Sequence, residues 1–178
     1  MLRCGLLGEK LGHSYSPEIH EMLAGYEYRL YERRAEELES FIKGGEWDGL
    51  NVTIPYKKAV LPLCDELGER ARLSGSVNTL VRRADGSIYG DNTDMFGFES
   101  LLHVNGIDPA GMKALVLGNG GACASVRAVL DSLGARTVVI SRRGEDNYNN
   151  LERHRDAGII VNTTPLGMYP KNAHRRST

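Results

Sequence analysis

The sequence lacks the features that mark secreted, membrane-spanning or nucleic-acid-binding proteins. Its three cysteines, Cys4, Cys64 and Cys123, are odd in number and widely spaced, and its five histidines show no metal-ligand spacing, so neither a disulfide framework nor a metal site is predicted. No signal-peptide pattern follows Met1, and no apolar run approaches the roughly 18 residues of a membrane span. A reducing cytoplasm is the expected location. The 22 basic residues nearly balance the 23 acidic ones, which favours small-molecule partners over nucleic acid or membrane.

The first half of the chain alternates between strand and helix patterns. RCGLLG (3–8), YEYRLYE (26–32) and DGLNVTI (48–54) are typical of strands, whereas SPEIHEMLAGY (16–26) and AEELESFIKGG (35–45) have helical spacing. Ser16 is the expected N-cap of the first helix and Pro17 its first helical residue. This order predicts an α/β fold with a largely parallel sheet. A pair of helices is expected in 57–73.

The pattern then changes to a hairpin followed by one more helix. SVNTLVRR and SIYGDNT flank Asp85-Gly86, which is a strong turn signal between two antiparallel strands. The segment 95–107 is expected to be helical, and the turn-forming DPAGMK marks a boundary after it. We therefore expect two domains, residues 1–107 and 108–178. The packing residues expected on the last helix are Phe96, Leu101, Leu102 and Val104.

The second domain begins like a Rossmann dinucleotide-binding unit. An apolar strand runs from Lys113 into a glycine-rich turn, a helix follows from about residue 122 to Gly134, and TVVISR is a second buried strand. Glycines at such a turn let a pyrophosphate approach the backbone N–H groups of the helix. An ordinary tight turn would use the same residues, since Cys123 stands at the third glycine position of the pattern. The candidate cofactor residues at the turn are Gly118, Asn119, Gly120, Gly121 and Ala122.

The end of the second strand bears on which dinucleotide is bound. Sites for NAD place an acidic residue there for the ribose 2′-hydroxyl, whereas sites for NADP place arginine against the 2′-phosphate. This chain has Ser141, Arg142 and Arg143 at that point, and its next carboxylate is Glu145. Arginine pairs in loops are often only solvated, but the pattern favours NADP over NAD.

Two charged residues of the first domain are open to two interpretations each. Lys57 follows the strand that ends at Pro55 and could be a solvated surface charge or a reagent. Asp94 precedes a helix and could simply cap it.

Six motifs in order decide between these interpretations. GHSYSP, NVTIPYK, SVNTL, GDNTD, GNGGA and VNTTPLGMYP resemble the shikimate dehydrogenase family, and the resemblance runs from residue 5 to about residue 170. It implies an N-terminal α/β substrate domain followed by a partial Rossmann NADP domain, and an enzyme that interconverts 3-dehydroshikimate and shikimate. It also implies that Lys57 and Asp94 form a catalytic pair, and that the substrate-binding residues are Ser14, Ser16, Thr53 and Asn78.

The chain also departs from the family pattern. Family members are about half as long again, and they contribute a glutamine to the substrate from a returning C-terminal segment, whereas this sequence contains no glutamine. A shortened chain is therefore expected, with self-association through an unpaired sheet edge or a loosely held second domain. Two alternatives remain at this point, a quinate/shikimate dehydrogenase that prefers NAD and a non-catalytic shikimate-binding fragment.

Overall fold

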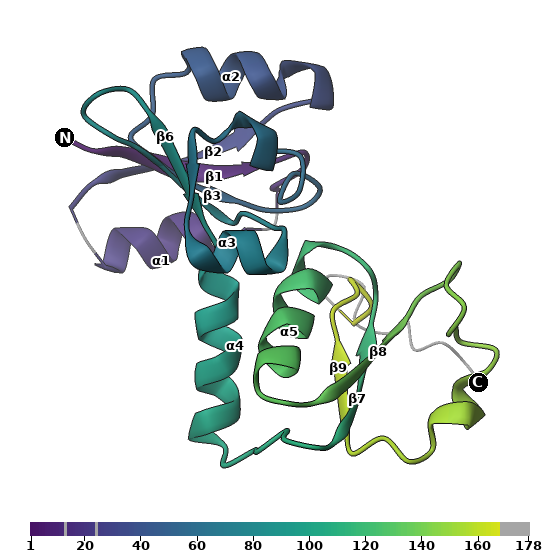
Figure 1. Cartoon of the computed structure of the whole chain (residues 1–178). Helices are drawn as coiled ribbons and strands as arrows, with labels where there is room; N and C mark the ends of the chain where they lie inside the picture. Colours follow the sequence, from purple (N-terminus) through teal and green to yellow (C-terminus); the bar gives the residue numbers. More distant parts are fainter. Residues whose placement is uncertain (13, 24, 168–178) are drawn as a thin grey trace. The chain divides into compact units, whose positions relative to one another are not determined.

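The computed structural model describes residues 1–12, 14–23 and 25–167 (Figure 1). His13 of the GHSYSP motif and residues 168–170 of the last motif lie outside the described residues. The chain divides into two compact units, Met1–Leu101 and Leu102–Thr178, and the division falls inside helix α4 (Thr93–Val104). Both units combine helices with parallel strands, which confirms the predicted α/β fold class.

The first unit contains a six-stranded mixed sheet in the order β2-β1-β3-β5-β6-β4. Strand β1 pairs in parallel with β2 and β3, whereas β5 runs antiparallel to both β3 and β6, so the sheet is less parallel than the sequence predicts. The hairpin accounts for the difference, because a short turn can join only antiparallel strands. The strands are β1 (Arg3–Gly8), β2 (Glu27–Glu32), β3 (Gly49–Val52), β4 (Glu66–Leu67), β5 (Thr79–Arg82) and β6 (Ile88–Asp91).

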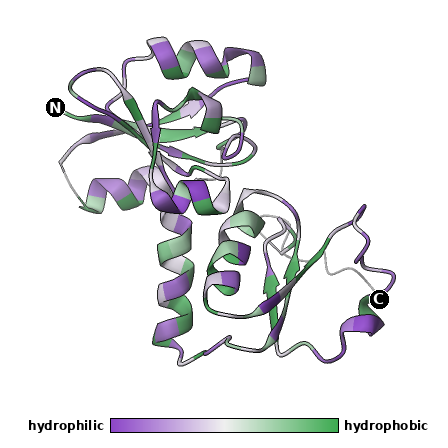
Figure 2. Cartoon of the chain, in the orientation of Figure 1, coloured by the Kyte–Doolittle hydropathy of each residue, from purple (hydrophilic) through white to green (hydrophobic). Residues whose placement is uncertain are grey.

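The core of the first unit lies between this sheet and helix α2 (Leu38–Gly44), which follows the short helix η1 (Ala35–Glu37). Leu7, Leu50 and Leu80 come from three adjacent strands and pack in one buried cluster with Ile42 of α2 and Trp47. Helix α1 (Ser16–Leu23) lies on the opposite side of the sheet (Figure 1). Hydrophobic and hydrophilic residues alternate along α2 in Figure 2, as expected for a helix with only one face in a core.

The expected pair of helices in 57–73 is wrong over most of its length. After Pro55 the chain makes turns, then a 3-10 helix η2 (Leu61–Leu63), the two-residue strand β4, and finally the short helix α3 (Glu69–Ser74). Pro62 has no N–H for a helical hydrogen bond, and the N–H groups of Asp65 and Gly68 donate instead to carbonyls of residues 88 and 90 in β6. Pairing with the sheet therefore replaces the helix that local propensity favours.

Two expectations about helix ends and faces also need correction. The N–H of Ile19 donates to the Tyr15 carbonyl, so Tyr15 rather than Ser16 is the N-cap of α1. The Ser14 hydroxyl oxygen caps this turn by accepting from the Ser16 N–H at 3.2 Å. On α4, Leu102 is buried as predicted together with Met95, seven residues earlier on the same face, because residues two helical turns apart share a face. The other residues expected to pack there, Phe96, Leu101 and Val104, are exposed.

The second unit contains a three-stranded parallel sheet in the order β8-β7-β9, and helix α5 (Gly121–Ser132) packs against β7 and β8. The sequence predicts all four elements. The strands are β7 (Lys113–Leu117), β8 (Arg136–Ile140) and β9 (Ile159–Asn162), and the short helix η3 (Leu151–His154) precedes the last of them. Among the described residues, no helix is long and apolar enough to cross a membrane.

Candidate active site

The topology of the first sheet brings six candidate residues to one edge, namely the edge formed by the ends of the strands and not by an outer strand. Strands β1 and β3 end at this edge, β5 begins there because it is antiparallel to β3, and β6 ends there because it is antiparallel to β5. The chain leaves or enters the sheet at this edge in the four segments that carry the candidates. Ser14 and Ser16 follow β1, Thr53 and Lys57 follow β3, Asn78 precedes β5, and Asp94 follows β6.

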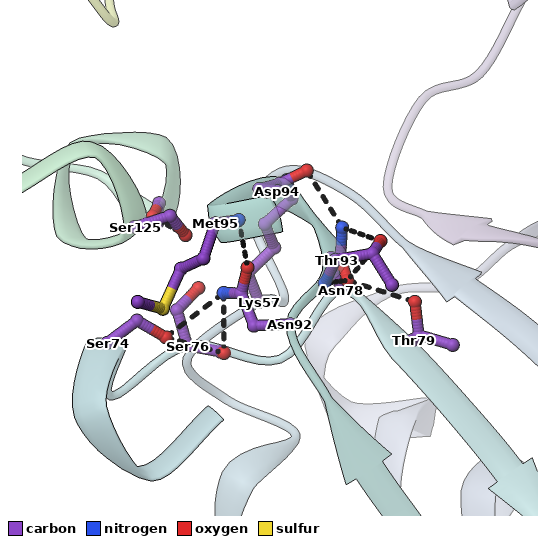
Figure 3. A network of polar contacts seen from close by, with 11 residues as sticks. Lys57, Ser74, Ser76, Asn78, Thr79, Asn92, Thr93, Asp94, Met95 and Ser125 are labelled. Atoms are coloured by element: carbon purple, nitrogen blue, oxygen red, sulfur yellow. Dashed lines mark hydrogen bonds and ion pairs between the residues drawn. The ribbon is translucent and has the colours of Figure 1, made fainter. Parts of the chain in front are cut away.

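Lys57 and Asp94, 37 residues apart in the sequence, form an ion pair (Figure 3). Lys57 Nζ donates to Asp94 Oδ2 at 2.6 Å, and the two side chains are 17% and 35% exposed. The backbone around the lysine is fixed as well, since its carbonyl accepts from the Val77 N–H at 2.7 Å. A shielded ammonium beside a carboxylate can still reach a ligand, because both side chains keep part of their surface open.

Asn78 is the centre of the polar network in Figure 3, and its side chain is buried. Its Nδ2 donates to Asp94 Oδ1 at 2.8 Å and to Thr93 Oγ1 at 3.0 Å. Its Oδ1 accepts from the Thr93 N–H and from the Thr79 hydroxyl, both at 2.9 Å. These four bonds fill the hydrogen-bonding capacity of one amide. Asn78 therefore holds the second carboxylate oxygen of Asp94, a contact that the sequence analysis did not anticipate.

Thr53 ends the strand segment that leads to Lys57. Its N–H donates to the Leu7 carbonyl at 2.9 Å, and its carbonyl accepts from the Tyr56 N–H at 2.9 Å. The first bond extends the pairing of β3 with β1 by one residue, and the second closes the turn into Lys57. A threonine hydroxyl thus stands at the point where the chain leaves the sheet, with the side chain half-buried.

Ser14 precedes α1, Ser16 is the first residue of this helix, and Tyr28 of β2 lies near Ser16. The Tyr28 hydroxyl donates to Asn51 Oδ1 at 2.8 Å. Burial raises the pKa of the Tyr28 phenol to about 12, and the nearby Ser16 side chain acts in the opposite direction. No role is predicted for Tyr28 or Asn51 from the sequence. Side chains alternate between the two faces of the sheet along β2, and this alternation places Tyr28 on the face that α1 covers.

The glycine-rich turn has the shape that a dinucleotide needs. Gly118 has φ of 113°, a left-handed conformation that favours glycine, and a Cβ there would lie 2.8 Å from Thr163 Oγ1. Gly120 is the N-cap of α5, and a Cβ at this position would meet nothing within 4 Å. Asn119 lies in the turn between β7 and α5, and Gly121 and Ala122 are the first two residues of α5. Open backbone at the positive end of a helix fits a pyrophosphate.

The basic loop after β8 is exposed at its tip and tied down at its base. Arg142 and Arg143 are exposed, whereas Ser141 is half-buried and its N–H donates to the Asp146 carbonyl at 3.2 Å. The Asp146 carboxylate is bonded in turn to the buried ring of His154, with Oδ1 2.8 Å from Nε2. No motif of the sequence indicates this pair, which fixes the loop while leaving both guanidinium groups accessible to an anion.

Within residues 1–12, 14–23 and 25–167, no group of three or more His, Cys, Asp or Glu side chains could hold a metal ion.

Comparison with known proteins agrees with this architecture. Residues 6–80 match the family model described as the shikimate dehydrogenase substrate binding domain. A shikimate dehydrogenase (NADP(+)) of Methanopyrus kandleri is 39% identical, in an alignment that covers 93% of this chain and 68% of the relative.

Solved structures extend the match to both units. Shikimate dehydrogenase 1 of Peptoclostridium difficile superposes with a TM-score of 0.89 at 33% identity, covering 100% of this chain and 73% of that one. The Thermus thermophilus shikimate 5-dehydrogenase in complex with NADP(H) and shikimate gives a TM-score of 0.81 at 32% identity, with 94% and 70% covered. A shared fold in both units and this degree of identity together place the chain in the shikimate dehydrogenase family.

Proposed function

We propose that this protein catalyses the NADP-dependent interconversion of 3-dehydroshikimate and shikimate, with Lys57 and Asp94 as the catalytic pair. The observation that carries the proposal is the 2.6 Å ion pair between them at the edge where six candidate residues gather. The NADP(+) specificity in the name of the Methanopyrus kandleri relative supports the choice of cofactor.

The pair suits the reduction of a ring ketone. As the ketone becomes an alcohol, negative charge develops on its oxygen, and a positioned ammonium stabilises that charge and donates the proton. Lys57 supplies the ammonium. The bond to Asp94 Oδ2 fixes the position of Lys57 Nζ before the substrate reacts, so the reaction does not bear the entropic cost of ordering the ammonium group. The opposite reaction uses the same groups, with Lys57 accepting the proton from the alcohol.

The remaining polar groups at this edge suit a carboxylated polyol. Ser14 and Ser16 stand at the positive end of α1, where a carboxylate is stabilised by the helix dipole and by hydroxyl donors. Thr53 and Asn78 offer a hydroxyl and an amide to the ring hydroxyl groups. Because the amide of Asn78 already bonds to Asp94 and Thr93, a ring hydroxyl would share these partners rather than meet a free group.

The second unit supplies the residues for NADP. The turn from Gly118 to Ala122 would hold the pyrophosphate with its backbone N–H groups, and Arg142 and Arg143 would meet the 2′-phosphate beside Ser141. When bound, NADPH provides the hydride for the ketone. The protein contributes the orientation and the polar groups around it.

Location and assembly form the last part of the proposal. Cys4, Cys64 and Cys123 form no disulfide bond with one another, which fits a reducing compartment such as the cytoplasm. Strand β9 is at an edge of its sheet and exposes Ile160, so a second copy of the chain could pair there in a homo-oligomer. Sedimentation velocity over a concentration series would test this assembly.

Catalysis is tested by comparing two adjacent lysines. Lys57→Ala should lower kcat for NADP reduction with shikimate by at least about 10²-fold, with a much smaller change in KM, because the lost interaction strengthens in the transition state. Lys58→Ala is the matched control, because Lys58 is exposed and outside the ion pair. Equal losses in the two variants, or an inactive unmodified protein, would contradict the proposed function.

A further inference from the structure

Asn92 is wholly buried and has no role in the chemistry described so far. Its Oδ1 accepts from the Met95 N–H at 3.2 Å, and its Nδ2 donates to the Ser76 carbonyl at 2.8 Å and to Ser74 Oγ at 3.1 Å. Burying an amide is unfavourable unless such bonds are made. The side chain is thus fully engaged, on one side with helix α4 and on the other with the segment that precedes β5.

The bond to Met95 fixes the helical turn that contains Asp94. Helix α4 begins at Thr93, so Asn92 is in the N-cap position and its oxygen accepts from the third helical residue, as capping side chains do. Asp94 lies between the capping residue and the capped N–H group. A change at Asn92 would therefore shift the backbone from which the Asp94 carboxylate projects.

The two donor bonds connect this turn to the segment that also holds the carboxylate. Ser74 and Ser76 lie four residues and two residues before Asn78, whose amide donates to Asp94 Oδ1. Asp94 is thus anchored twice to the segment 74–78, through its backbone by Asn92 and through its carboxylate by Asn78. Figure 3 shows both asparagines in this network.

Asparagine at position 92 suits both roles, capping α4 and bonding to the segment 74–78. Serine, threonine and aspartate cap helices as well as asparagine, because capping requires only an acceptor. Only asparagine among these can accept from Met95 and also donate two hydrogen bonds from one amide group. An aspartate here would face the Ser76 carbonyl with a buried negative charge.

We propose that Asn92 is a positioning residue for the catalytic reaction, acting through Asp94 by holding the first turn of α4 against the segment 74–78. The proposal rests on the proposed function, since it assigns Asn92 to the pair that Lys57 and Asp94 form. It predicts that the contribution of Asn92 to turnover disappears when the Asp94 carboxylate is absent.

A double-mutant cycle tests this coupling. Asn92→Ala should lower kcat about 10-fold in the protein that retains Asp94, because small displacements of catalytic groups reduce turnover strongly. In an Asp94→Ala background the same change should alter kcat less than about 2-fold, since residues that act as a unit are not additive. The KM for NADP should stay constant throughout. Asn92→Ser, which keeps a capping oxygen but cannot reach both acceptors, replaces Asn92→Ala if that variant does not fold.

Ile42→Val is the control for a general loss of stability. Ile42 is fully buried in the core of the same unit and takes part in none of the hydrogen bonds described above for the network, so this variant should unfold more easily and keep its kcat in both backgrounds. The positioning role alone would be overturned if Asn92→Ala lowered kcat by the same factor with and without Asp94. It would also be overturned if Asn92→Ala alone left kcat unchanged. Full activity of Asp94→Ala would overturn the proposed function together with this inference.

Discussion

Replacing Asp94 by asparagine tests the ion pair with almost no change in shape. In the structure, Asp94 Oδ1 accepts from Asn78 Nδ2 at 2.8 Å and Oδ2 accepts from Lys57 Nζ at 2.6 Å. An asparagine offers one acceptor and one donor in place of two acceptors. Whichever way its amide turns, either Lys57 or Asn78 faces an NH₂ group instead of an oxygen.

The size of the effect follows from the bond that is lost. A hydrogen bond to a charged group contributes about 1.5–3 kcal/mol. If this amount is lost from the transition state, kcat should fall by about 10- to 150-fold, since each 1.36 kcal/mol corresponds to a factor of ten. Lys57→Ala removes the proton donor itself, and its predicted loss of at least about 10²-fold begins in the upper part of this range.

The assay is the initial rate of NADP reduction with shikimate, measured over a range of both substrates. Asp85→Asn serves as the matched control, because Asp85 is an exposed carboxylate in the turn between β5 and β6 and bonds only to Ser87 among the described residues. The control should keep its kcat. An Asp94→Asn variant with kcat within about 2-fold of the unmodified protein would refute the reasoning, because the carboxylate would then not be needed to orient Lys57.

Two further predictions concern the cofactor and the effect of pH. Arg142→Ala should raise the KM for NADP by about 10-fold or more and leave the KM for NAD nearly unchanged, because only NADP has a 2′-phosphate for the guanidinium; equal changes for both cofactors would contradict this. Burial raises the pKa of the Tyr28 phenol to about 12 in the folded chain, above the ordinary tyrosine value of about 10, so the unfolded state loses this proton first and the stability contributed by Tyr28 declines as pH rises from about 10 to 12. Tyr28→Phe should remove this part of the pH dependence in urea unfolding, and identical pH profiles for the two proteins would argue against it.

Local patterns predicted the parts of the fold in which the sequence signal and the tertiary contacts agree. The apolar strands 3–8 and 113–117 and the hairpin at Asp85-Gly86 are confirmed, since buried strands and turn residues leave clear signals. The helices expected in 57–73 failed, because pairing of the residues around Leu67 with β6 competes with helix formation there. That pairing joins segments about twenty residues apart, and no local period reveals it.

Local sequence patterns predict the contacts within the candidate site even less well than they predict the fold. Lys57 and Asp94 could be proposed together because both belong to motifs of a known family, and the structure brings them to 2.6 Å. The asparagines that hold Asp94 have no comparable signal, since Asn92 bonds to Ser74 and Ser76 across 18 and 16 positions and Asn78 bonds to Asp94 across 16. Asparagine is common in turns for local reasons, so its presence there does not indicate a buried network. Burial makes the difference, because an amide removed from water must satisfy its donors and its acceptor at once and so fixes the segments that it joins.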